Sequence, residues 1–130
     1  MTTRAEVETN NADFCAALGR GDIDRVVSSF DPEAVMLAPG APLAHGSGGI
    51  REYFEQAIAG GVGRPAEMRT TQIDELADGA VAEVGEYTMT IAPPDAEPFE
   101  DFGKYMVVHR RDSHGRLRIW RDTFHSDRQS

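Results

Sequence analysis

Two ionisable residues lie among apolar neighbours in the last third of the chain, where two β-type runs are joined by a polar loop. Lys104 belongs to the first run and Asp122 to the second. A charge in a half-buried strand is unfavourable unless it is paired or used for chemistry. The pattern therefore favours Asp122 as a general acid or base with a raised pKa. A structural salt bridge, or a hydrogen bond to the backbone, is the alternative.

Lys104 and Glu83 are the residues expected to set the charge of Asp122. Glu83 shares strand parity with Val81 and Tyr87, so we expect it to point inward, where it needs a partner. Cross-strand pairing makes Lys104 the first candidate partner of Glu83 or Asp122. An unpaired, desolvated Lys104 would instead act as a base or stabilise an enolate, and both interpretations stay open. Asp122, Lys104 and Glu83 are the candidate catalytic residues.

The histidines give no clear sign of a metal site. No two of them have the spacing of zinc ligands, such as i and i+4 on a helix. The sequence also has no glycine-rich phosphate loop and no nucleophile elbow. We therefore expect neither a metal nor a cofactor. His45, which precedes a predicted helix near the expected opening of the fold, is kept as a candidate ligand contact.

Length and composition indicate one domain, residues 1–130, with 40% hydrophobic and 27% charged residues. The formal net charge of −9 disfavours nucleic acid and anionic membrane surfaces as partners. No apolar stretch approaches the ~18–20 residues needed to span a bilayer. Cys15 is the single cysteine, so no internal disulfide can form, and we expect a cytoplasmic location.

The predicted elements group by type along the chain. Apolar residues at helical spacing predict helices at about 3–19, 23–30 and 47–60, with a short strand at about 34–38 between the last two. After Pro65 the period changes to two, which predicts strands at about 66–76, 80–92, 100–111 and 116–125. Early helices and a late meander indicate an α+β fold. We expect a cone-shaped, curled antiparallel sheet wrapped around the three N-terminal helices.

Such a cone would hold a small-molecule pocket between its sheet and its helices. The candidate contacts are residues expected on the inner face of the sheet, on the apolar helix stripes or at the opening. They are Tyr87, Trp120, Phe124, Asn11, Phe14, Met36, His45, Tyr53 and Met106. The inward face of the strand around Lys104 stays undecided, because apolar residues alternate on both of its faces. An apolar outer face would need a cover, which predicts a homodimer.

Four segments of the sequence resemble a known family. They are Gly21–Asp24, Phe30–Val35, His45–Phe54, and Gly103–Tyr105 continuing through Trp120–Asp127. In this order they are similar to the nuclear transport factor 2-like superfamily, and to its SnoaL-like and SgcJ-like branches. The resemblance implies a dimeric protein with one apolar pocket per chain and no metal or organic cofactor. Its relatives include ketosteroid isomerase, limonene epoxide hydrolase, scytalone dehydratase, polyketide cyclases and non-catalytic association domains.

The sequence departs from this pattern at known catalytic positions. The aspartate base of ketosteroid isomerase falls near Ala38, and that enzyme's helix-one tyrosine falls near Phe14, so its arrangement is absent. No full Asp-Arg-Asp set of limonene epoxide hydrolase can be placed. The polyketide cyclases of the superfamily use an aspartate in the last strand, which the resemblance carries to Asp122. Fold alone does not fix the function.

These observations lead to one hypothesis and two alternatives. The leading hypothesis is cofactor-free acid/base chemistry on an apolar, carbonyl-bearing metabolite: cyclisation, isomerisation, dehydration or epoxide opening. A closed ion network of Lys104, Glu83 and Asp122 would favour a non-catalytic binding module instead. A cavity filled by Trp120, Phe124, Met36 and Met106 would favour a dimerisation module.

Overall fold

The computed structural model describes residues 1–129. In chain order the elements are α1 (Thr3–Gly19), α2 (Ile23–Ser28), β1 (Phe30–Leu37), β2 (Ala44–His45), α3 (Gly46–Ala59), β3 (Ala66–Glu75), the short 3-10 helix η1 (Ala77–Gly79), β4 (Val81–Ile91), β5 (Phe99–Arg111) and β6 (Leu117–Ser126). The expected α+β fold with three early helices and a late meander is therefore confirmed. No helix within residues 1–129 is long and apolar enough to cross a membrane.

The strands form one six-stranded sheet in the order β2-β1-β6-β5-β4-β3. The meander from β3 to β6 is antiparallel, as expected. The sheet is nevertheless mixed, because β1 pairs with β6 in parallel. The first strand thus extends the sheet beyond the C-terminal strand and covers what would otherwise be an open edge.

The first strand is longer than the sequence predicts, since it begins at Phe30 rather than near Ala34. Pro32 lies inside it, where the pairing with β6 shifts register between Phe30 and Val35. A proline in a strand is tolerated at such an irregularity because no regular ladder hydrogen bond is lost. The second helix accordingly ends at Ser28. The two-residue strand β2 has no sequence signal strong enough to predict it.

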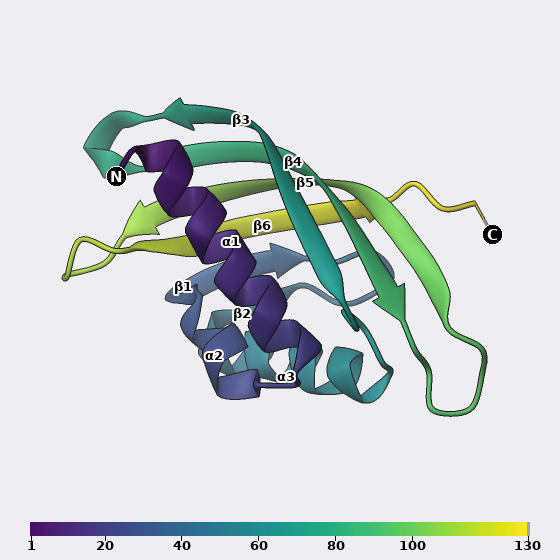
Figure 1. Ribbon diagram of the computed structural model, residues 1–130. Coiled ribbons are helices and arrows are strands. Elements are labelled where there is room, and N and C mark those ends of the chain that lie inside the picture. The colour runs from purple at the N-terminus through teal and green to yellow at the C-terminus, as the bar shows by residue number, and fades with distance from the viewer. Residues whose placement is uncertain (130) are drawn as a thin grey trace.

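The helices cover the concave side of the curled sheet. In Figure 1, α1 crosses in front of the sheet, while α2 and α3 lie together beneath β1 and β2. Helix α1 packs against β3, and α3 packs against β1. The largest core cluster joins both layers; it includes Leu18, Phe30, Phe54, Tyr105 and Ile119. The space between these layers is where a ligand cavity is expected.

Candidate active site

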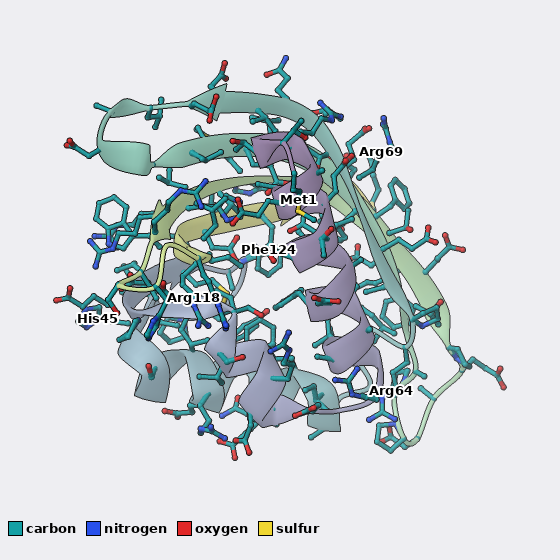
Figure 2. The ribbon with its side chains drawn as sticks, turned by 60° about the vertical axis from the view of Figure 1, so that its left-hand side comes forward. Met1, His45, Arg64, Arg69, Arg118 and Phe124 are labelled. Carbon is teal, nitrogen blue, oxygen red and sulfur yellow. The ribbon has the colours of Figure 1, made fainter. Side chains whose placement is uncertain are left out.

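A cavity of about 190 Å³ lies between the helices and the concave face of the sheet. Its walls are mostly apolar and come from α1, α3 and four strands. The lining residues are Phe14, Cys15, Leu18, Tyr53, Phe54, Val62, Ala66, Glu67, Met68, Tyr87, Met89, Ile91, Asp101, Tyr105, Val107, Ile119, Asp122 and Phe124. No lysine, arginine or histidine is among them. Figure 2 shows Phe124 in this interior, between α1 and the sheet.

Asp122 is a carboxylate in this apolar setting. It lies on β6 opposite Val107, it is half-buried, and it lines the cavity. Burial, followed by the negative charge of Glu83, raises its pKa from 3.8 to about 7. Within residues 1–129 its carboxyl group accepts no hydrogen bond. Its proton affinity is therefore increased, and among residues 1–129 no hydrogen-bond donor compensates the charge of the ionised carboxylate.

A bulge in β6 determines which side chains of this strand face the cavity. Val108 pairs with Arg121 and His109 pairs with Ile119, which leaves Trp120 as the extra residue. Ile119 and Asp122 consequently face inward on either side of it. Trp120 faces outward, with the guanidinium of Arg121 3.8 Å from its ring centroid. Of the two aromatic residues expected on the inner face of this strand, Phe124 lines the cavity, and Trp120 does not.

Tyr53 brings a hydroxyl group from α3 to the same cavity. It is half-buried, and burial together with the charge of Asp122 raises its pKa. The phenol therefore stays protonated at neutral pH and can donate a hydrogen bond. Within the described residues its hydroxyl has no hydrogen-bonded partner. Asp122 and Tyr53 are thus two polar groups of the cavity that are free to bind a ligand.

Glu83 is fully buried at the centre of a hydrogen-bonded cluster. Its carboxylate accepts bonds from Asn11 Nδ2 at 2.8 Å, Thr70 Oγ1 at 2.9 Å and the Tyr105 hydroxyl at 2.5 Å, and it contacts His109 Nε2 at 2.9 Å. Burial tends to raise its pKa, but the bonds from His109, Tyr105 and Thr70 together lower it. Glu83 is therefore held as an anion by hydrogen bonds.

Glycine in β4 makes room for this cluster. A Cβ atom at Gly85 would lie 2.3 Å from the Tyr105 hydroxyl oxygen and 2.6 Å from the Arg69 carbonyl oxygen. The absence of a side chain there lets the Tyr105 ring lie over the strand and reach Glu83.

A second set of hydrogen-bonded polar side chains lies near the C-terminal end of β6, beside the first residues of β5. The Tyr87 hydroxyl donates to Asp101 Oδ2 at 3.1 Å, and Ser126 donates to the other oxygen of Asp101. Burial and the charge of Asp101 raise the pKa of Tyr87 well above its ordinary value. Tyr87 does line the cavity, but its hydroxyl is already engaged, so its ring, which packs against Phe124, is the surface offered to a ligand.

Several expected site residues lie elsewhere. On β5 the inward residues are Gly103, Tyr105, Val107 and His109, which leaves Lys104 and Met106 exposed on the outer face. Lys104 forms an ion pair with Asp127, so its predicted pairing with Glu83 or Asp122 is wrong. Met106 is 48% exposed and does not line the cavity.

Three further candidates have other positions. His45 is exposed at the start of α3, at the outer edge of the molecule in Figure 2. Met36 is fully buried in the core rather than in the cavity wall. Asn11 is buried, but its side chain binds Glu83 and Thr70 instead of facing the cavity. Phe14, Tyr53, Tyr87 and Phe124 do line the cavity.

The sequence missed Tyr105 and His109 as the partners of Glu83. Glu83 pairs with Val107, so Tyr105 and His109 are its two diagonal neighbours on β5. Both faces of that strand carry apolar residues, so sequence parity alone could not choose between them. Had the inward position of Glu83 been used to fix the register, these two residues would have been the candidates. Within residues 1–129 no group of three His, Cys, Asp or Glu side chains could hold a metal ion.

A curled sheet packs over three helices and leaves an apolar cavity lined by Asp122 between the two layers, which is the architecture of a cone-like α+β domain. The profile of the SnoaL-like domain matches residues 12–120, so the chain belongs to the SnoaL-like family of the nuclear transport factor 2-like superfamily. The resemblance seen in the sequence is confirmed at this level. No curated protein sequence matches the chain.

Solved structures show the same fold at low sequence identity. A ketosteroid isomerase-like protein from Erwinia carotovora atroseptica has a TM-score of 0.83 and 17% identity, over 96% of each chain. ActVI-ORFA from Streptomyces coelicolor has a TM-score of 0.77 and 18% identity, over 95% of this chain and 96% of its own. A Catenulispora acidiphila protein in complex with S-DNPA has a TM-score of 0.75 and 24% identity, over 95% and 92%.

Proposed function

We propose that the cavity binds a neutral, apolar carbonyl compound and that Asp122 transfers a proton at the carbon next to the carbonyl group, without a cofactor. The observation that carries this proposal is the position of Asp122: a carboxylate with a pKa of about 7 in an apolar cavity, with no hydrogen bond from any described residue. A general base is most effective when its pKa lies near the working pH. Isomerisation, cyclisation and dehydration all begin with such a proton transfer.

The proposed steps use two side chains. The Asp122 carboxylate removes a proton from the α-carbon, and the electron pair of the broken C–H bond forms an enolate. The protonated Tyr53 hydroxyl donates a hydrogen bond to the enolate oxygen, where negative charge develops. The Asp122 carboxyl group then returns its proton to the same carbon or to another one, which leaves the enzyme unchanged.

The size and charge of the cavity narrow the substrate class. An engineered apolar cavity of about 150 Å³ is large enough for benzene. A cavity of about 190 Å³ therefore suits a molecule with one ring or two small fused rings. Its ionisable lining residues include Glu67, Asp101 and Asp122 and no basic residue, which disfavours an anionic ligand. A larger polycyclic substrate would need a bigger cavity and is therefore not favoured.

Hydrogen–deuterium exchange tests the proposal directly. Neutral ketones such as 1-indanone and 2-tetralone are incubated with the protein in D₂O, and the loss of the α-proton signal is followed by NMR. We expect exchange faster than in buffer alone for at least one ketone. Ketones that raise the melting temperature without any added exchange would contradict catalysis. That outcome would favour the non-catalytic binding module.

Removing the Tyr53 hydroxyl should slow this exchange. We expect Tyr53→Phe to lower kcat by about 10²-fold, the usual effect of losing one donor to a developing oxyanion, with little change in KM. The matched variant Tyr87→Phe should lose much less, because the Tyr87 hydroxyl donates to Asp101. Steady-state exchange rates for both variants check this. Equal losses in the two would mean that the Tyr53 hydroxyl has no special role.

We further propose that the protein is a homodimer that pairs through the outer face of its sheet. Val84, Phe102 and Met106 are 36%, 47% and 48% exposed on the adjacent strands β4 and β5. Sedimentation velocity at micromolar concentration should give twice the chain mass of 14.2 kDa. Met106→Glu should shift the protein to the monomer, because it buries a charge in the interface. A wild-type monomer would contradict the proposal.

A cytoplasmic location stays a prediction.

A further inference from the structure

Glu83 and Asp122 lie in one row across three neighbouring strands. Glu83 on β4 pairs with Val107 on β5, and Val107 pairs with Asp122 on β6. All three face the concave side of the sheet. Two strand spacings of about 4.8 Å place the Cα atoms of the two acidic residues roughly 10 Å apart. A single valine therefore separates two carboxyl groups in the interior.

Three of the four side chains that contact the Glu83 carboxylate are neutral. The carboxylate is fully buried, and its partners Asn11, Thr70 and Tyr105 are neutral donors. Among residues 1–129, His109 is the one contact of this carboxylate that could carry a positive charge. The ionisable groups that line the cavity around Asp122 are Tyr53 from α3, Cys15 from α1, Glu67 from β3, Tyr87 from β4, and Asp101 and Tyr105 from β5, none of them cationic. A fixed negative charge at Glu83 is felt strongly at this distance, since apolar surroundings screen it weakly.

We propose that Glu83 is a positioning residue for the proton chemistry at Asp122: its buried charge, acting across Val107, keeps Asp122 able to hold a proton at neutral pH. Asn11, Thr70, Tyr105 and His109 serve this role by holding Glu83 ionised. The functional meaning of the inference rests on the proposed role of Asp122, but the electrostatic effect itself does not.

The directions of the two pKa shifts agree with this geometry. Hydrogen bonds, against burial, lower the pKa of Glu83, while burial and the Glu83 charge raise that of Asp122. Two carboxyl groups whose surroundings push their pKa values apart can hold different protonation states at one pH. In this pair Glu83 would be the permanent anion and Asp122 the group that gains and loses the proton.

A direct titration of Asp122 tests the inference without any substrate. The carboxyl carbon of Asp122 is followed by ¹³C NMR between pH 4 and 9, and Asp122→Asn identifies its signal. Glu83→Gln removes the charge and should lower the pKa of Asp122 by about one unit. Glu83→Met is a second neutral variant of similar volume. Glu86→Gln is the matched control, because it removes a carboxylate from the same strand at an exposed position that is ion-paired with Arg69.

The outcomes separate this inference from the proposed function. A lower Asp122 pKa in a folded neutral Glu83 variant, with an unchanged Asp122 pKa in Glu86→Gln, supports it. An unchanged pKa in a folded neutral variant overturns it, and so does failure of both neutral variants to fold, because Glu83 would then be a structural residue. If Asp122→Asn loses proton exchange but the pKa of Asp122 is unchanged in Glu83→Gln, this inference alone is contradicted. If the pKa of Asp122 falls in Glu83→Gln but Asp122→Asn keeps its proton exchange, the proposed catalysis alone is contradicted.

Discussion

Asp122→Asn should lower the rate of α-proton exchange by about 10³-fold while leaving ligand binding nearly intact. The amide keeps the size and polarity of the carboxyl group but cannot accept a proton, and general base catalysis typically contributes 10²–10⁴-fold. The base must be ionised, so in the wild type kcat/KM should rise with pH and level off above about 7, the pKa of Asp122. Exchange rates measured by NMR from pH 5 to 9 check both statements.

The matched control for this variant is Asp127→Asn. Asp127 follows the same strand but is exposed and forms an ion pair with Lys104 outside the cavity. It should keep the wild-type rate and the wild-type pH profile. Exchange in Asp122→Asn within a factor of a few of wild type would remove the catalytic role. A pH profile that rises at the same pH in the Asp122→Asn variant would assign the titration to another group.

The sequence predicts the fold well because its signals are local and mutually consistent. Helical stripes come first, period-two strands follow, and a curled sheet over helices is the simple way to bury both. The parallel pairing of β1 with β6 could not be predicted, because it joins segments about 85 residues apart that have no shared local signal. The SnoaL-like resemblance supports the same architecture, and the matching profile confirms it.

The site was predictable only where strand parity was unambiguous. Glu83 lies on a strand with one clearly apolar face, and its inward position follows from that pattern. Lys104 lies on a strand that is apolar on both faces, so parity could not place it. Trp120 was misplaced because one inserted residue reverses parity, and a bulge leaves no mark in a strand of mixed composition.

The Glu83 cluster shows a further limit of sequence reasoning. From the sequence, the expected partner of the buried Glu83 carboxylate is the cationic side chain of Lys104. In the structure the Glu83 carboxylate is instead bound by side chains from three other elements: the hydrogen-bond donors Asn11, Thr70 and Tyr105, and His109. Hydrogen bonding alone can keep a buried carboxylate ionised. No spacing in the sequence reveals such a set, because α1, β3, β4 and β5 meet there only in the folded chain.

Stability should fall as pH rises from about 4 to about 7, the opposite of the usual trend for acidic residues. Asp122 has a pKa of about 7 in the folded protein and an ordinary value near 3.8 when unfolded. In that window the folded protein holds a proton that the unfolded chain has released, so rising pH favours unfolding. The difference corresponds to roughly 2–4 kcal/mol of lost stability at pH 8. Urea unfolding at pH 5 and pH 8 measures it.

Asp122→Asn should abolish this loss, because the amide does not ionise. The variant should be more stable than wild type at pH 8 by most of that amount and nearly equal to it at pH 4. Asp127→Asn controls for the change in net charge. Glu83 acts in the opposite direction: its pKa is lowered, so its contribution is lost only in acid, below its ordinary value of 4.5. The wild type should therefore be most stable between about pH 4 and 4.5, and an optimum at neutral pH would mean that Asp122 is solvated and unsuited to the proposed chemistry.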